Sequence, residues 1–292
     1  KTTTAGILSH LAKEAGLKVI RNSTGSNLER GIASTLISSY PLPTTNYQSN
    51  LGIWELDEAA FNTAVHKIKP QVIVFLNVFR DQLDRYGEVD SIVKNWCETL
   101  KKLDPKTGVL INGDDANILK LKPCFPGKVE TFGVENYKIA GESLEKTSAH
   151  KLDFEAKNVK ISGLKRSSFT VALPATSYQL PATLPLPGLY HIYDALAALI
   201  WAFHLGFPLP KLLKSLGNYS PAFGRFEKLP FGFIFLIKNP AGATQVFETL
   251  AGQIKPQDRL LLALNDNFAD GTDVSWIWDV DFELFQNPSR AK

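Results

Sequence analysis

The sequence has no methionine and only two cysteines in 292 residues. A chain of this length with otherwise ordinary composition should contain several methionines, so we expect residues to be missing internally and at both ends. Motif spacings are then short by a residue or more. Cys97 and Cys124 lie far apart and form no CxxC motif, which excludes a disulfide scaffold and a four-cysteine zinc site built from these residues alone.

A large net charge and a long apolar run are also absent. The 32 lysines and arginines against 29 aspartates and glutamates give a net charge of +3. This charge is too small to indicate nucleic acid or an anionic surface as the main partner. The longest apolar runs, such as residues 231–237, fall well short of the roughly 20 residues of a membrane-spanning helix. We therefore expect a soluble, cytoplasmic protein with no nucleic-acid partner and no transmembrane segment.

The first half of the chain alternates between helical patterns and short apolar runs. Helices are predicted at 5–15, 58–68 and 90–103, and strands at 18–20, 52–56, 71–76, 108–111 and 128–132. Continuous apolar strands separated by helices indicate a parallel sheet that is covered on both faces. Such a sheet binds ligands at the carboxyl ends of its strands.

The pattern changes near residue 151. Residues 151–173 alternate with period two, which predicts a small antiparallel insertion. A proline-rich stretch at 174–187 follows and leads to a strongly apolar helix at 191–205.

A second α/β unit is predicted near the end of the sequence. After a linker at 220–226, it contains a strand at 231–237, a helix at 243–254 and a strand at 259–264. We therefore divide the chain into a central domain and an incomplete C-terminal domain. The predicted bounds are 1–222 for the central domain, about 137–187 for its β-rich insertion and 223–292 for the C-terminal domain.

The sequence opens with Lys1-Thr2-Thr3-Thr4 at the start of a predicted helix. This tetrapeptide matches the end of a phosphate-binding loop. In such a loop a lysine reaches the β- and γ-phosphates, a hydroxyl binds Mg²⁺ and backbone N–H groups hold oxyanions. Threonines also cap ordinary helices, and the tetrapeptide alone favours that simpler interpretation.

Acidic and amide side chains follow two predicted strands. Glu55, Asp57 and Glu58 come at the end of the strand at 52–56, and the segment 77–84 follows the next strand. Both lie at the sheet edge where a nucleotide would bind. Because Mg²⁺ prefers carboxylate and phosphate oxygens, Glu55 is a candidate metal ligand. We interpret Glu58 as a first-turn acid favoured by the helix dipole, and Asp57 suits either role.

Two polar residues, His191 and Asp194, stand at the start of the apolar helix, and Gly224-Arg225-Phe226-Glu227 follows downstream. A lone aspartate at a helix start is usually a cap. The order of these segments, after the lysine and threonines and the acidic strand ends, indicates more than capping.

Taken in order, the segments KTTT, WELDEA, NVFRDQLDRYGEVD, NGDD, PGLYHIYDALAA and FGRFE resemble the Mur ligase superfamily. Its members are ATP-dependent enzymes that activate a carboxylate as an acyl phosphate and pass it to an amine. Two later segments, KNPAGA and NDNFADGTDVSWIWD, are similar to the MurT family, the ligase-like subunits of lipid II isoglutaminyl synthase. The resemblance implies a Mur ligase-like α/β fold, with a P-loop ATPase domain on the parallel sheet and a C-terminal Rossmann-like domain.

The resemblance also implies a site for ATP and Mg²⁺. Its phosphate-binding residues are Lys1, Thr2 and Thr3, and its Mg²⁺ ligands are Thr2 and Glu55. Further residues that face ATP or substrate are Gly25, Ser26, Asn27, Arg30, Asn77, Asp194 and Arg225. Many superfamily members have histidine at the position of Gln82 and asparagine at those of His191 and Asp194, so the roles of these three residues stay open.

The family often carries a four-cysteine zinc ribbon at a place that corresponds to residues 137–151. That segment contains no cysteine. Either this member lacks the ribbon or the segment is missing from the sequence, and we predict that the chain binds no zinc.

For function, the resemblance implies ATP-dependent amidation of the D-glutamate α-carboxylate in the lipid II stem peptide, at the inner face of the cell membrane. A GatD-type glutaminase, bound as a heterodimer, would supply the ammonia along a shielded path. Asp273 is the predicted third member of the partner's catalytic triad, with Asp270 and Asp279 as rivals.

Two other interpretations remain. An amino-acid-adding or folylpolyglutamate-synthase-like ligase would share the ATP site but lack the segment at 269–279. A non-enzymatic α/β binding module would need none of the ordered ATP motifs.

Overall fold

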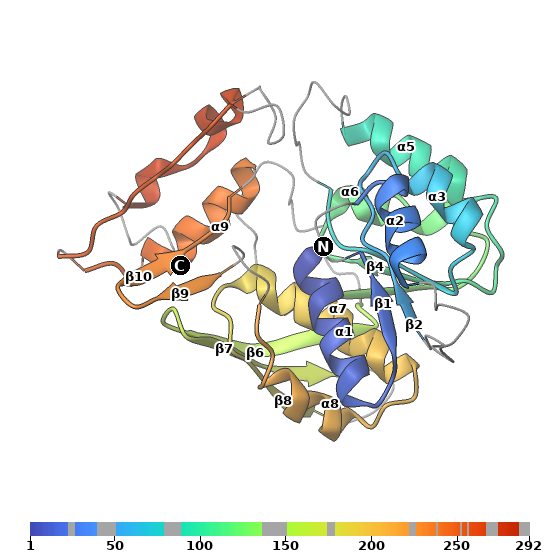
Figure 1. The fold of residues 1–292 in the computed structure, drawn as a ribbon, viewed down its shortest axis with the longest axis horizontal. Coiled ribbons are helices and arrows are strands. Elements are labelled where there is room, and N and C mark those ends of the chain that lie inside the picture. Colours follow the sequence, from blue (N-terminus) through green and yellow to red (C-terminus); the bar gives the residue numbers. More distant parts are fainter. Residues whose placement is uncertain are drawn as a thin grey trace.

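The computed structural model places the chain in an α/β fold (Figure 1). It describes residues 1–22, 27–39, 51–78, 89–135, 151–173, 179–221, 226–237, 239–251, 253–255, 257–266 and 274–285. The helices are α1 (Thr2–Glu14), α2 (Glu29–Ser39), α3 (Phe61–Ile68), α5 (Val89–Leu100), α6 (Ala116–Leu119), α7 (Leu189–His204), α8 (Leu209–Leu216) and α9 (Pro240–Ala251), with 3-10 turns η1 (Lys122–Cys124), η2 (Ser275–Asp279) and η3 (Phe282–Phe285). The strands are β1 (Val19–Arg21), β2 (Leu51–Ile53), β3 (Val72–Phe75), β4 (Gly108–Asn112), β5 (Val129–Val134), β6 (Phe154–Ser162), β7 (Arg166–Ala172), β8 (Gln179–Leu184), β9 (Glu227–Leu229) and β10 (Gly232–Ile234).

The main sheet has six strands among the described residues, in the order β3-β4-β5-β6-β7-β8. Its pairs are parallel from β3 to β6 and antiparallel from β6 to β8. Both the parallel sheet and the antiparallel strands predicted from the sequence are confirmed. The antiparallel strands continue the main sheet, because β6 pairs with β5 on one side and with β7 on the other. Strands β1 and β2 form a separate parallel pair beside it.

Strand β8 lies in the proline-rich stretch for which we predicted no strand. Its residues pair with β7, and Pro181 stands opposite Thr170. Proline has no backbone N–H to donate to a neighbouring strand, so it is tolerated in a sheet mainly at the edge. β8 is the last strand of the sheet and provides such an edge.

The two faces of the main sheet pack into separate cores. On one face, Ile73 and Ile111 pack with Trp96 and other side chains of α3 and α5. On the other face, Leu110 and Phe132 pack with α1, α7 and α8. Helix α7 is buried along almost its whole length, as its apolar composition predicts. The parallel part of the sheet is therefore covered on both sides, whereas β6, β7 and β8 contribute to one core only.

The two cysteines are joined. Cys97 of α5 and Cys124 of η1 form a disulfide with their Cα atoms 5.2 Å apart, across 27 residues of sequence. Sequence spacing alone could not reveal this pair, because only the packing of α5 against η1 brings the cysteines together. One such bridge fastens a loop and does not constitute a disulfide scaffold.

In the described part of the C-terminal region there are a short hairpin, the α-helix α9 and the 3-10 turns η2 and η3. β9 and β10 pair in antiparallel fashion, and α9 packs against η2 and η3 through a small cluster of apolar side chains that includes Phe247 and Val280. The predicted strand at 259–264 is wrong, because these residues have no regular structure and are all exposed. The leucine-rich run favours a strand only if a neighbouring strand pairs with its backbone, and none does so among the described residues.

None of the helices in the described part of the chain is both long enough and apolar enough to cross a bilayer.

Candidate active site

The start of α1 brings the lysine and threonines to the carboxyl end of β2. The Lys1 backbone carbonyl accepts the first helical hydrogen bond from the Ala5 amide, at 3.0 Å. Thr3 and Thr4 are buried, whereas the Lys1 side chain keeps 32% of its surface exposed. The backbone amides at the start of a helix and a lysine ammonium are both groups that suit an anionic ligand.

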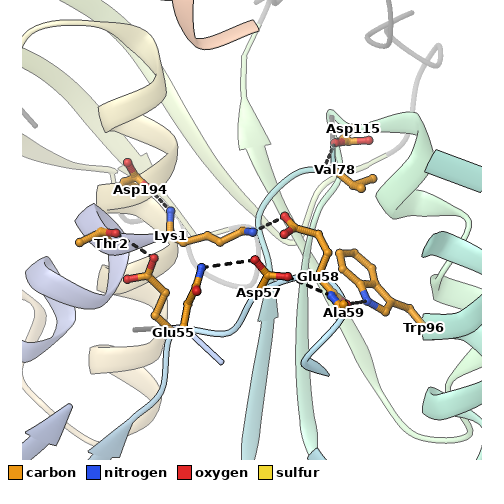
Figure 2. Close-up of polar contacts among 11 residues, drawn as sticks. Lys1, Thr2, Glu55, Asp57, Glu58, Ala59, Val78, Trp96, Asp115 and Asp194 are labelled. Atoms are coloured by element: carbon orange, nitrogen blue, oxygen red, sulfur yellow. Dashed lines mark hydrogen bonds and ion pairs between the residues drawn. The ribbon is translucent and has the colours of Figure 1, made fainter. Parts of the chain in front are cut away.

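Glu55 faces Thr2 across this region (Figure 2). The Thr2 hydroxyl donates a hydrogen bond to Glu55 Oε1 at 2.8 Å. Asn22, at the end of β1, fixes the Glu55 backbone from both sides: its amide nitrogen donates to Glu55 O at 2.8 Å, and its side-chain oxygen accepts from Glu55 N at 2.9 Å. The hydroxyl and the carboxylate are oxygen donors of the kind that Mg²⁺ prefers, so this pair fits the predicted metal.

Asp57 has a structural role. Its carboxylate accepts from the Ala59 amide at 3.2 Å and from Asn27 Nδ2 at 3.5 Å, while its own amide donates to Asn27 O at 2.9 Å. These contacts shape the turn that leads into α3 and hold Asn27 beside the site. Of the two roles that the sequence left open for Asp57, that of a first-turn acid is wrong, because α3 begins at Phe61 and has no acidic residue in its first turn, and that of a metal ligand stays a prediction.

Our interpretation of Glu58 as a first-turn acid is wrong. Helix α3 begins at Phe61 and has no acidic residue in its first turn. Glu58 instead forms an ion pair and hydrogen bond with Lys1 Nζ, and its backbone carbonyl accepts from the Trp96 indole at 2.9 Å (Figure 2). The turn that precedes α3 keeps Glu58 out of the helix, so the helix dipole does not determine its position.

Asp194 joins α7 to the start of α1. Its carboxylate accepts a hydrogen bond from the Thr4 hydroxyl, and the backbone nitrogen of Lys1 lies 4.0 Å from its Oδ1 atom. Burial raises the pKa of Tyr219 to about 12, and the negative charge of Asp194 adds to the shift. The pKa of Tyr190 is raised by the same two causes in the same order. Both tyrosines therefore stay neutral around Asp194.

The residues that follow β3 and β4 complete the edge of the sheet. Asn77 lies two residues after the end of β3, and the next residue, Val78, donates its amide to Asp115 Oδ2 at 3.1 Å. Asp115 is fully buried and also caps α6 through the amides of Asn117 and Ile118. Burial raises the pKa of Asp115 despite these hydrogen bonds.

His191 lies in the first turn of α7. It is 1% exposed, and its Nδ1 atom lies 2.5 Å from the carbonyl oxygen of Pro187. Gly188, between them, has a φ of +93°, a conformation that side chains with a Cβ rarely adopt. These contacts indicate that His191 stabilises the entry to α7.

The structure thus brings Lys1, Thr2, Glu55 and Asp194 together, with Thr3 in the same helical turn. Asn27 lies before α2 and contacts Asp57, and Asn77 lies after β3. Gly25, Ser26, Gln82, Arg225, Asp270 and Asp273 lie outside the described residues. Sequence reasoning missed Asn22 and Trp96. Asn22 follows the predicted strand at 18–20, and the argument from strand ends could have found it. The role of Trp96 depends on the packing of α5, which no local pattern reveals.

Within the described residues, no group of three or more histidine, cysteine, aspartate or glutamate side chains gathers as a metal site. The place of the zinc ribbon in the family falls almost entirely outside those residues. The absence of zinc therefore stays a prediction.

A helix N-terminus that presents a lysine and threonines to carboxylates at the ends of parallel strands defines a phosphate-binding α/β domain. Comparison with known families agrees with this class. The family model described as Mur ligase middle domain matches residues 1–202, and the one described as MurT ligase C-terminal matches residues 236–292. The chain therefore belongs to the Mur ligase family and, within it, to the MurT group.

Individual relatives agree with this assignment. The chain is 30% identical to the MurT subunit of lipid II isoglutaminyl synthase (glutamine-hydrolyzing) from Streptococcus pneumoniae, over 97% of this chain and 69% of that protein. It is 28% identical to the MurT subunit from Staphylococcus aureus strain COL, with the same two coverages.

Among solved structures, MurF from Acinetobacter baumannii has a TM-score of 0.69 at 18% identity, covering 87% of this chain and 52% of that one. MurF from Thermotoga maritima in complex with ADP has a TM-score of 0.63 at 18% identity, covering 85% and 54%. The chain spans about half the length of these solved relatives. This likeness confirms the Mur ligase-like fold.

Proposed function

We propose that this chain catalyses the amide-forming reaction of a lipid II isoglutaminyl synthase. The reaction converts the D-glutamate α-carboxylate of the stem peptide to D-isoglutamine at the expense of ATP. The observation that carries the proposal is the arrangement of Lys1, Thr2, Glu55 and Asp194 at the start of α1, in a chain whose C-terminal part matches the MurT family. An amino-acid-adding ligase shares the first feature only.

The residues of the site have separate roles in this proposal. Lys1 and the backbone amides of the first turn of α1 bind the phosphates of ATP and stabilise the negative charge that develops during phosphoryl transfer. Thr2 and Glu55 hold Mg²⁺, which neutralises charge on the phosphate oxygens. Asp194 fixes the start of α1 through Thr4 and so keeps Lys1 and Thr2 in register with Glu55.

The chemistry takes two steps. A carboxylate oxygen of the stem peptide attacks the γ-phosphorus of ATP, so that an acyl phosphate forms and ADP leaves. Ammonia then attacks the acyl carbon, phosphate leaves with the electrons of the broken bond, and a proton is lost from nitrogen to give the amide. Only neutral ammonia carries the lone pair that attacks, and in water near neutral pH most ammonia is protonated.

We further propose that a GatD-type glutaminase makes the ammonia and delivers it from a docked position. A shielded path between the two subunits keeps ammonia from protonation and loss. The relatives are MurT subunits of a glutamine-hydrolyzing lipid II isoglutaminyl synthase, which supports a second subunit and the lipid II substrate. Because this substrate is attached to lipid, we place the complex in the cytoplasm at the inner face of the membrane.

Asp273 would serve the partner's active site. A glutaminase with a cysteine nucleophile and a histidine base needs a third group that fixes the histidine tautomer. Nearby, Trp276 packs with the cluster on α9, whereas Trp278 is 87% exposed. An exposed tryptophan suits a protein interface, where aromatic residues are enriched. This supports the segment at 265–279 as the place where the partner docks.

The direct test supplies the full-length protein, with its glutaminase partner, with lipid II, ATP and either glutamine or ammonium salt. Mass spectrometry of the stem peptide distinguishes the amide from the acid. We expect amidation with both nitrogen sources, and loss of both activities in Glu55→Gln, which keeps the size of the side chain and removes a metal ligand. Amidation by Glu55→Gln at the wild-type rate would contradict the proposed metal site.

A further inference from the structure

Lys1 and Glu58 form an ion pair at the entrance to the site. The Lys1 ammonium contacts Glu58 Oε1, and the two side chains keep 32% and 16% of their surface exposed. The proposed function assigns this same ammonium to the phosphates of ATP. A carboxylate and a phosphate oxygen are both anions that bind an ammonium through charge-assisted hydrogen bonds, so they compete for its donors.

Glu58 is held in place independently of Lys1. Its backbone carbonyl accepts the Trp96 indole N–H at 2.9 Å. Trp96 is 5% exposed and packs edge-on against Phe61 with ring centroids 5.9 Å apart. The neighbouring Asp57 amide is bonded to Asn27 O at 2.9 Å. The backbone of Glu58 is therefore fixed by the core of α3 and α5, which keeps its carboxylate within reach of Lys1.

The other two acids of the segment do not share this role. The Asp57 carboxylate accepts the Ala59 amide and the Asn27 side chain. Glu55 accepts the Thr2 hydroxyl, a neutral donor. Of the three acids between β2 and α3, Glu58 is the one that the structure pairs with the phosphate-binding lysine.

We propose that Glu58 is an internal competitor for Lys1, and that its carboxylate sets the affinity of the site for nucleotide. This inference rests on the proposed function, because it needs Lys1 to bind phosphate. Nucleotide binding then exchanges one anion for another on Lys1, and the cost of breaking the ion pair lowers the observed affinity. Glu58 acts through Lys1 and is a positioning residue.

The test measures binding of Mg²⁺-ADP to the full-length protein by isothermal titration calorimetry. The β-phosphate of ADP is one of the phosphates that a loop lysine contacts. In Glu58→Gln, which keeps the size and removes the charge, we expect the Kd to fall by about two- to five-fold, since partly exposed ion pairs contribute on the order of one kcal/mol or less. A variant that merely damaged the structure would bind more weakly.

The matched control is Glu98→Gln. Glu98 also pairs with a lysine, Lys101, at 2.7 Å, but both side chains are more than half exposed on α5. We expect its Kd for ADP to equal that of the wild type. An equal gain in both variants would show a general effect of charge and would overturn the proposal.

Glu58→Gln is also tested in a protein that already carries Lys1→Gln. This comparison distinguishes competition for Lys1 from simple repulsion between Glu58 and the phosphates. If Glu58 acts through Lys1, the gain from Glu58→Gln should fall to less than about two-fold when Lys1 is already changed to Gln, because the two effects are coupled. The same gain in both backgrounds would assign the effect to repulsion and overturn the proposal.

Failure of the proposed function gives a different result. A wild-type protein that binds no ADP would overturn the nucleotide site itself. A wild-type protein that binds ADP, with Glu58→Gln binding equally or more weakly, would leave the site intact and overturn only the competition by Glu58.

Discussion

Two apolar runs of similar length, residues 108–112 and 259–264, have different structures. The first is β4, which lies between β3 and β5 with a core on each face of the sheet, and its Leu110 and Ile111 are fully buried. The second has no regular structure, and its Leu261 is 89% exposed. The difference teaches that an apolar run becomes a strand only where neighbouring strands pair with its backbone and where other elements cover its side chains.

The N-terminal and C-terminal regions also differ in their proposed functions. The largest expected effect comes from a substitution in the C-terminal region. The N-terminal region holds the proposed ATP site, whereas the C-terminal region holds Asp273. If Asp273 orients the partner's histidine, Asp273→Asn should lower glutamine-dependent amidation by about 10³- to 10⁴-fold, as loss of the third triad group does elsewhere. Ammonia-dependent amidation and assembly of the complex should survive. Wild-type glutamine-dependent activity in this variant would show that Asp273 is not the third triad member, and Asp270 and Asp279 would then be tested.

The structural comparison predicts unequal effects on stability. Phe132, on β5, is fully buried, so Phe132→Ala should lower the free energy of unfolding by about 3–5 kcal/mol through lost burial and the cavity left behind. Leu261→Ala in the exposed run should change it by less than about 0.5 kcal/mol. Urea unfolding of both variants checks this. A similar loss in both would show that residues 259–264 are buried in solution.

The disulfide between Cys97 and Cys124 should stabilise the N-terminal region. Closing a loop across 27 residues restricts the unfolded chain, and this effect is typically about 2–4 kcal/mol. The double variant Cys97→Ser with Cys124→Ser should therefore unfold at a lower temperature than the oxidised wild type. The control is reductant, which should destabilise the wild type and leave the variant unchanged. Reductant that changed neither protein would argue against the bridge.

The smallest expected effect concerns Glu248 on α9. Burial raises the pKa of Glu248 from 4.5 to about 7, and the nearby Asp281 carboxylate adds to the shift. Because the folded protein binds more protons than the unfolded chain between these values, stability should fall as pH rises through this range and stay level above it. After allowance for solvent screening, the change should be about 1 kcal/mol or less.

Glu248→Gln should remove this pH dependence, since it cannot ionise. Unfolding free energies of both proteins at pH 5 and pH 8 give the comparison. Identical pH dependence in the wild type and Glu248→Gln would contradict the raised pKa.

The sequence predicted the parts of the fold that depend on local pattern. Apolar runs gave β3, β4 and β5, and period-two alternation gave β6 and β7. The sequence pattern did not predict β8. Pro181 favours a loop unless the strand is known to lie at the edge of the sheet. The sequence pattern also predicted a strand at 259–264. This prediction was wrong because a run of leucines does not show whether another strand pairs with its backbone.

The candidate site shows the same limit. Lys1, Thr2 and Glu55 were predicted from motif and strand-end position, and the structure brings Thr2 and Glu55 into contact. The pairing of Glu58 with Lys1 could not be predicted, because it depends on where α3 begins and on the indole of Trp96, which comes from a helix far along the chain. Local patterns identify residue types suited to a site, whereas tertiary packing decides which of them meet.

The central claim is that the start of α1 forms the ATP site of an amide-forming ligase. Its most direct test is ammonia-dependent amidation of lipid II by Lys1→Ala, with ATP and ammonium salt supplied so that the glutaminase reaction is not needed. The account predicts that activity falls by about 100-fold or more, because a charge that stabilises the phosphoryl transfer is lost, while the partner's hydrolysis of glutamine continues. Full ammonia-dependent activity in Lys1→Ala would contradict it.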